Sequence, residues 1–384
     1  MDQSLLELDP ASAPARSAAD DAGFQLGWDH AHHGLVPPPE LLLDGTPLRQ
    51  GWQAGRSVFG QRTMAALQPV RRWLALRTDA WRQGVSVETT QLTAHYIAQI
   101  EVSHCPVTLK PLGGVSAAAD APVIERLRHD AGYAAGHVVM MSRQAATARA
   151  GCTSAQALAT ATSMEARGEV EHAGLDAAAW RRLAALISFV TPMPHAQAAA
   201  MPMCVLPPNR VRVLNPAQGL QALVSWQLAA PGWSRRLRQL GEMAEEITGE
   251  SALRQDFQLF IGAIAPRALE LPAIDSCASH SLAQRLALAQ LWSDARVMRR
   301  WQHWLLSLGE AATEALLNRA AAAGLAGVRT LLHEKSAATE GWVSALPGLL
   351  KPTRRRVRVV GPGRRSVAGD GAPLQPPLQP PGQR

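Results

Sequence analysis

The chain has 384 residues, of which 47% are hydrophobic and eleven are Trp, so it can bury a substantial core. Its formal charge is +7, but residues 351–384 hold eight of the 38 basic side chains and one of the 31 acidic ones, which leaves the first 350 residues with 30 of each. This balance excludes a uniformly basic folded body, so any contact of that body with nucleic acid must come from local clusters of Arg.

Several common classes are excluded by missing motifs. The chain has no G-x-x-x-x-G-K-[ST] loop and no G-x-G-x-x-G turn, so we expect no nucleotide cofactor. Its four cysteines form no C-x-x-C pair, which favours reduced thiols over a disulfide framework. The first residues lack the pattern of a signal peptide, and no apolar run approaches the roughly 20 residues of a membrane span. We therefore expect a cytoplasmic protein without a membrane partner.

The first elements in chain order are a tail and two helices. Residues 1–20 are rich in Ala, Ser and Asp, and we expect them to be disordered. Residues 21–60 carry several Gly, Pro and Trp, which indicates an ordered but irregular segment. Apolar spacing predicts a helix over 63–82 that begins or bends at Pro69, and a second helix over 87–99.

The next segment has a different pattern. We expect short strands at 100–108, 123–127 and 138–141, with a loop between the last two. Ser142 then precedes a helix that runs to Arg149 and stops at Gly151. The N-terminal region 21–151 is thus predicted to end in a small α+β unit of a β-hairpin and a helix, near residues 100–150.

The remaining chain reads as helical up to residue 346, which we assign to a second domain, 152–346. The apolar stripes are typical of the core of a helical bundle. The predicted helices span 177–190, 218–229, 234–248, 251–264, 281–308, 310–323 and 328–346. Residues 347–384 are rich in Pro, Gln, Gly and Arg, and we expect a disordered basic tail. The predicted fold class is mainly α.

One stretch carries chemical information: His104-Cys105-Pro106-Val107-Thr108, Ile124-Glu125-Arg126-Leu127, the loop Asp130 to Val138, and Met140-Met141-Ser142. Over about residues 24–150 it resembles a family of uncharacterised bacterial proteins with the pattern C-P-V-T, S-x-D-R, G-Y-x-x-G-N-L and M-S-x-x-A-N-x-A-K. That pattern in turn resembles a derived HNH, or His-Me finger, nuclease core. The resemblance implies a β-hairpin and a helix that hold a His base and a divalent metal at a scissile phosphate.

The chain departs from that pattern at the positions of the chemistry. Glu125-Arg126 stands where HNH cores have Asp-His, and Arg cannot act as a general base because its pKa exceeds about 12. His137 replaces the loop Asn, and residues 145–149 offer no metal ligand on the helix. The framework residues Gly132 and Tyr133 are kept. We therefore expect a degenerate unit without catalysis.

Two replacements leave an active, metal-dependent endonuclease open as an alternative. His129 lies four residues after Glu125 and could supply a base, and His137 could bind a metal together with Glu125. Glu125, His129 and His137 are thus the candidate catalytic residues. The sequence identifies no metal site, and it implies no cofactor unless a divalent ion serves such an activity.

Arginines suggest DNA or RNA as a partner. The helix over 63–82 has the highest density of positive charge in the body, and the tail has a cluster that suits phosphate contacts. The candidate nucleic-acid-binding residues are Arg71, Arg72, Arg126, Arg354, Arg355, Arg356 and Arg358. A rival hypothesis is a scaffold whose helical half binds a protein partner through Trp292, Trp301 and Trp304, if these are exposed.

His30, His32 and His33 form a short tract that could bind a divalent ion such as zinc. Such tracts are more common in solvated loops, and a solvated loop is our prediction for this one.

Overall fold

The computed structural model describes residues 17–113, 118–270, 282–325, 339 and 341–342. All of them fall within one compact unit. The predicted tail and its arginines 354, 355, 356 and 358 lie outside the described residues, as does most of the predicted helix 328–346. The predicted domain boundary after residue 151 stays a prediction.

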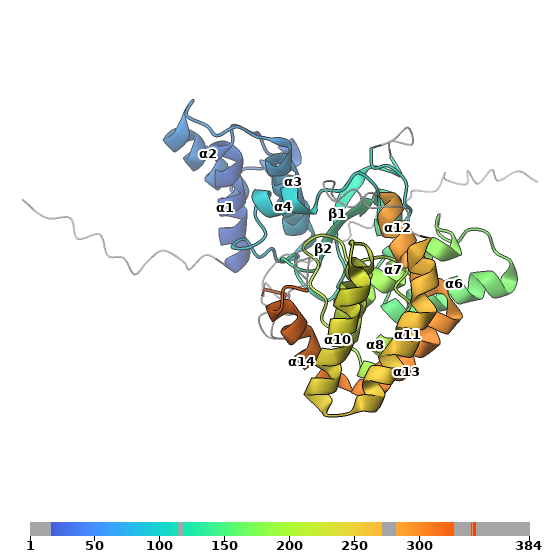
Figure 1. Ribbon diagram of the computed structural model, residues 1–384. Helices are drawn as coiled ribbons and strands as arrows, with labels where there is room; N and C mark the ends of the chain where they lie inside the picture. The colour runs from blue at the N-terminus through green and yellow to red at the C-terminus, as the bar shows by residue number, and fades with distance from the viewer. Residues whose placement is uncertain (1–16, 114–117, 271–281, 326–338, 340, 343–384) are drawn as a thin grey trace, which may run out of the picture. The chain divides into compact units, whose positions relative to one another are not determined.

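The described residues are mainly α-helical, as predicted (Figure 1). They form fourteen α-helices, two short 3-10 helices and one two-stranded sheet. No helix among them is long and apolar enough to cross a membrane.

The described residues begin with two helices, mostly within the segment 21–60 that we predicted to be irregular. Helix α1 (Ala18–His32) starts at a capping box formed by Ser17 and Asp20, and α2 (Pro47–Phe59) starts at Thr46. A 3-10 turn, η1 (Pro39–Leu41), lies between them. The prediction of an irregular segment over 21–60 was therefore wrong where α1 and α2 lie, and α1 begins three residues before the predicted end of the N-terminal tail.

Close packing explains this error. A Cβ at Gly27 of α1 would lie 1.9 Å from the carbonyl oxygen of Leu48, and a Cβ at Gly51 of α2 would lie 1.9 Å from that of Phe24. The two helix backbones can approach this closely only because both positions are Gly. Two of the glycines that suggested irregular structure therefore lie where the two helices touch.

Helix α3 (Gln68–Gln83) begins next to Pro69, as one of the two readings expected. Helix α4 (Ala94–Ile100) is shorter than predicted, because it begins only at its cap, Thr93. Before the cap, the backbone N–H groups of Thr90 and Gln91 donate to the side chain of Glu88 and not to backbone carbonyls of a helix. The predicted strand 100–108 is absent: beyond Ile100, His104 forms only an isolated bridge with Pro111.

A hairpin and a short helix follow, as predicted. Strand β1 (Pro122–Arg126) pairs antiparallel with β2 (Val138–Ser142), and the register places Glu125 opposite Val139. Helix α5 (Arg143–Arg149) begins at once, because the Ser142 hydroxyl accepts a hydrogen bond from the Ala145 N–H at 3.3 Å. The two faces of β2 belong to different core clusters, with Val139 and Met141 packed toward α6 and α7 and Val138 packed toward α3 and α4.

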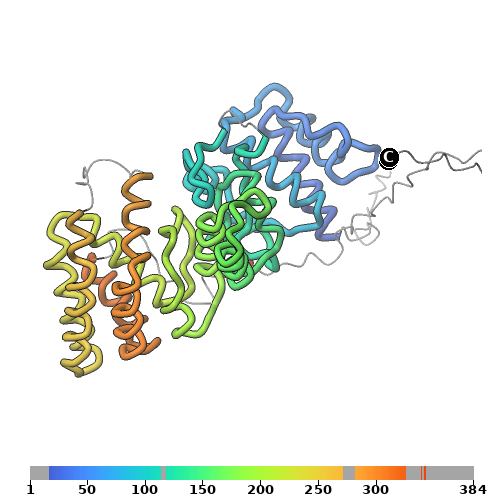
Figure 2. Tube along the Cα trace, turned by 90° about the vertical axis from the view of Figure 1, so that its right-hand side faces the viewer, coloured from blue at the N-terminus to red at the C-terminus, as the bar shows by residue number. Residues whose placement is uncertain are grey.

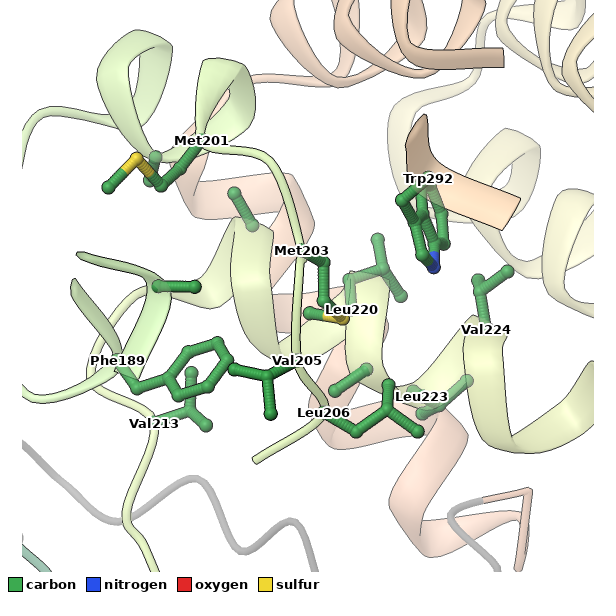
Figure 3. Packing of buried hydrophobic residues seen from close by; sticks show 14 of the residues in the cluster. Phe189, Met201, Met203, Val205, Leu206, Val213, Leu220, Leu223, Val224 and Trp292 are labelled. Atoms are coloured by element: carbon green, nitrogen blue, oxygen red, sulfur yellow. The ribbon is translucent and has the colours of Figure 1, made fainter. Parts of the chain in front are cut away.

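The rest of the described chain is helical. Its elements are α6 (Ser154–Arg167), α7 (Ala177–Phe189), α8 (His195–Ala200), α9 (Pro216–Leu228), α10 (Trp233–Thr248), α11 (Ser251–Leu269), α12 (Leu282–Gln290), η2 (Leu291–Ser293), α13 (Ala295–Leu308) and α14 (Glu310–Ala322). Every residue of α9 is buried, so this helix forms the centre of the core. Figure 3 shows its Leu220, Leu223 and Val224 among Met203, Leu206 and Trp292.

Helices α10, α11 and α13 lie side by side (Figure 2). Helices α11 and α13 run antiparallel, since Arg267 near the end of α11 lies 3.5 Å from Asp294 at the start of α13, and Asp256 near the start of α11 lies 3.5 Å from His303 near the end of α13. The single helix predicted over 281–308 is broken, because Asp294 has an extended backbone and caps α13.

Candidate functional site

The hairpin and α5 place Glu125 beside an arginine. The carboxylate of Glu125 accepts a hydrogen bond from Nη1 of Arg149 at 3.1 Å, and Nη2 of Arg149 donates to the carbonyl oxygen of Leu127 at 3.1 Å. The Arg149 side chain is 2% exposed, and that of Glu125 is 22% exposed. Burial lowers the pKa of Arg149, and the charge of Glu125 opposes this shift. The carboxylate therefore already has a cation as its partner.

Arg126 holds the loop between the two strands. Its guanidinium donates to the carbonyl oxygens of His129, at 3.3 Å, and Ala131, and lies 4.9 Å from the ring centre of Tyr133. The residue is 7% exposed. Arg126 therefore organises the loop, and its burial leaves little of it for the phosphate contact that we predicted.

His137 ends the loop and is fully buried. Its ring lies 4.5 Å from that of Trp342, between ring centres, and neither ring nitrogen has a partner at hydrogen-bond geometry among the described residues. Burial lowers the pKa of His137 to about 3, the charge of Arg126 lowers it further, and the backbone of Gly132 opposes the shift. His137 is thus a neutral imidazole at physiological pH.

His129 lies on the outside of the same loop. The residue is exposed, and its ring lies beside Gly151, after the end of α5. Within the part of the chain that the structure describes, no three His, Cys, Asp or Glu side chains form a group that could hold a metal ion. The three candidate catalytic residues thus belong to one hairpin but have different surroundings: a paired carboxylate, an exposed ring and a buried ring.

A groove of about 430 Å³ runs between α3 and the hairpin. Its rim carries Arg72 from α3 and Arg143 from α5, and its lining includes Glu125 and Tyr133. Burial raises the pKa of Tyr133, and the charge of Glu125 adds to the effect, so the phenol stays protonated. The groove therefore offers two guanidinium groups and a phenol, beside a carboxylate that Arg149 neutralises.

The candidate arginines of α3 have different partners. Arg72 forms an ion pair with Glu101, and the two side chains are 27% and 35% exposed. Arg71 is exposed and donates its Nε–H to the carbonyl oxygen of Ala66 at 3.0 Å. It lines another cavity, beside the turn Pro37–Pro39. Only Arg72 of this pair borders the groove over the hairpin.

The histidine tract is helical, so the predicted loop was wrong. His30 is buried on α1 and its Nε2 lies 3.3 Å from the Thr78 hydroxyl, while the ring of His32 stacks on Phe59 with 4.4 Å between centres. Burial lowers the pKa of His30 to about 4, with the charge of Arg77 as the second cause. Burial also lowers the pKa of His33. These rings serve the contact between the first helices.

Sequence reasoning missed three residues of the site, the first of which is Arg143, absent from the candidate arginines. In the sequence analysis Arg149 counted only as one of the helix residues that cannot bind a metal. A cation on a helix that packs against a strand with a carboxylate could have predicted the ion pair. Trp342 lies 207 residues after the carbonyl of Ala135, to which its indole donates, so no local pattern could associate the two.

Comparison of the chain with protein-family models, with curated proteins and with solved structures found no match. The resemblance to HNH cores stays a prediction.

Proposed function

We propose that this protein binds nucleic acid through the groove between α3 and the hairpin, without cleaving it. The groove would contact phosphate groups with Arg72 and Arg143, and the Arg-rich segment 354–358 would add contacts that do not depend on sequence.

The ion pair between Glu125 and Arg149 supports the second half of the proposal, that the protein does not cleave nucleic acid. A divalent ion at this carboxylate would have to displace a buried guanidinium that also bonds the Leu127 carbonyl. It would also meet the charge of that guanidinium at close range. Metal-assisted hydrolysis needs the opposite arrangement, an open carboxylate that faces the scissile phosphate.

The charges around the groove support the first half of the proposal, that the groove binds nucleic acid. Arg143 is exposed at the first turn of α5, and it has no ion pair with another described residue. Glu125 and Asp79 also line the groove, but Arg149 pairs with the first at 3.1 Å and Arg82 approaches the second at 3.9 Å. The remaining positive charge is small, so we expect weak binding that is sensitive to salt.

The rival scaffold hypothesis loses its main support. Trp292, Trp301 and Trp304 are 1%, 0% and 0% exposed and pack with Phe257 and Phe260 in the core. Exposed tryptophans were the condition for their role as binding hot spots, so that expectation was wrong.

The test is equilibrium binding of the full chain to labelled duplex and single-stranded DNA and RNA over a salt series. We expect the affinity to fall steeply with salt, and deletion of 351–384 to reduce the slope without abolishing binding. Parallel incubation with Mg²⁺ or Mn²⁺ should leave the nucleic acid intact. Cleavage that is lost in His129→Ala or Glu125→Gln would establish the active endonuclease instead, and absence of binding at low salt would reject both.

A further inference from the structure

Strand β1 has a free edge, because the sheet among the described residues contains only β1 and β2. The Leu127 N–H donates to the His137 carbonyl oxygen at 2.7 Å, and the Arg143 N–H donates to that of Ala121 at 2.9 Å. Both bonds continue the register of the hairpin, so the odd-numbered residues of β1 are those that exchange hydrogen bonds with β2. The N–H and C=O groups of Ile124 therefore point away from β2, toward the free edge.

The groove of about 430 Å³ runs along this edge. Four consecutive residues of β1, 122–125, line it, and so do residues of both α3 and α5. Helix α3 belongs to the core cluster on the Ile124 face of the sheet, and α5 belongs to the cluster on the Val139 face. A cavity that touches helices from both faces and every residue from 122 to 125 lies beside the strand, with the two helices as its walls.

The edge is recessed between these walls, since none of the residues 122–125 is exposed. Among the described residues, no backbone group outside the hairpin bonds to Pro122 or Ile124. Open N–H and C=O groups on an edge are able to pair with another chain. Ala75 of α3 and Ala146 of α5 contribute only methyl groups to the walls, which leaves room between them. A recessed edge admits one extended chain, whereas a second copy would bring its own two helices against α3 and α5.

We propose that the free edge of β1 binds an extended peptide segment of a partner protein, which adds a third strand to the sheet. Ile124 would exchange two main-chain hydrogen bonds with the peptide, and the Pro122 carbonyl oxygen would accept a third. Side chains of the added strand alternate between the two walls. Ala75 leaves space for an apolar side chain at the α3 wall, while Arg143 at the α5 wall is exposed and has no ion pair with another described residue. The partner segment therefore alternates apolar and acidic residues.

The experiment is fluorescence anisotropy of the full chain with a labelled, capped octapeptide of alternating Val and Glu. Two further peptides carry N-methyl groups on every Val or on every Glu. Because the N–H groups of a strand alternate between its two edges, one of these peptides loses the donors that face Ile124 and should bind at least about tenfold more weakly, while the other keeps them. The titration contains no nucleic acid, so this proposal and the proposed function can fail independently, although their ligands would compete for one groove.

Three variants locate the peptide. Ala75→Trp fills the groove from an exposed position and should abolish binding, while Ala315→Trp, at an exposed position of α14, should bind like the wild type. Arg143→Ala should weaken binding of the Val/Glu peptide by about two- to fivefold, as expected for an exposed ion pair, and should not change binding of a Val/Gln peptide.

Three results would overturn the proposal: no binding of the Val/Glu peptide, equal effects of the two N-methylated forms, or equal losses in the two Trp variants. Sedimentation equilibrium of the chain alone is the remaining control. A dimer that Ala75→Trp dissociates would assign the edge to a second copy, against the proposal, whereas the same oligomeric state in both proteins agrees with it.

Discussion

Arg149 and Glu125 form an ion pair of 3.1 Å between the short helix and the first strand of the hairpin. The same guanidinium satisfies the carbonyl of Leu127, so one buried cation ties α5 to the strand at two points. The unit of hairpin and helix thus contains its own internal positive charge, and this pair has consequences for stability that can be measured.

Removal of one partner should be costly. Arg149→Met leaves Glu125 without its cation and Leu127 without its donor, and we expect a loss of roughly 3 kcal/mol in the free energy of unfolding, because a broken buried pair leaves an uncompensated charge. Glu125→Leu/Arg149→Met should recover most of this loss, since apolar pairs can replace buried ion pairs. Urea denaturation measures both. A single variant as stable as the wild type would show that the pair does not stabilise the unit.

Acid should destabilise the fold through two histidines. The pKa values of His30 and His137 are about 4 and about 3 in the folded state, below the ordinary 6.5. Below pH 6.5 the unfolded chain therefore binds protons that the folded chain rejects, and stability falls by about 1.4 kcal/mol per pH unit and histidine until the folded-state pKa is reached. Above pH 6.5 neither ring contributes to the pH dependence.

The measurement for this prediction is urea denaturation at pH 5 and pH 7. His137→Phe should be at least as stable as the wild type at pH 7, because it removes two ring nitrogens at hydrogen-bond geometry with no other described residue, and should lose less stability at pH 5. His95→Ala, at an exposed ring that has no ion pair with another described residue and contacts only the Gln99 side chain, is the control and should keep the pH dependence of the wild type. An equal loss in His137→Phe and the wild type would mean that His137 is protonated in the folded protein.

Replacement of Gly by Ala should have opposite effects on stability at two positions, one in the contact between α1 and α2 and one in an open part of α11. Gly51→Ala would place a methyl group 1.9 Å from the carbonyl oxygen of Phe24, so α1 and α2 must separate, and we expect a loss of about 3 kcal/mol or more. Gly262→Ala, in the middle of α11 with nothing within 4 Å, should instead gain roughly 0.5–1 kcal/mol from helix propensity. Thermal unfolding of the two variants measures the difference, and a tolerated Gly51→Ala would contradict the packing of α1 on α2.

The elements that sequence predicted well are those fixed by local chemistry. Ser142 before α5 and Asp176 before α7 are caps whose side chains accept backbone N–H groups within one turn, so their positions can be read from the sequence. The hairpin strands were recognisable because β2 is a short apolar run between turn residues. Such signals do not depend on the rest of the chain.

The elements that sequence missed depend on distant partners. Gly27 and Gly51 look like helix breakers until their two helices are placed in contact. Asp294 divides an apolar stripe that continues on both sides of it, because its own backbone is extended and its side chain caps α13. In the site, the groove needs α3 and α5 together, and the cover over His137 comes from Trp342. Only the hairpin residues and Arg72 could be identified in advance.

The central claim is that the groove over the hairpin contacts phosphate, and a comparison of charge-matched variants tests it most directly. Arg72→Ala/Arg143→Ala removes two cations from the groove, while Arg299→Ala/Arg300→Ala removes two exposed cations from α13. Affinity for a labelled DNA duplex is measured over a salt series. The groove variant should bind about tenfold more weakly at low salt and lose up to about 0.9 in the salt slope for each phosphate contact, while the α13 variant should bind like the wild type. Equal losses in the two variants, or no loss in the groove variant, would contradict the account.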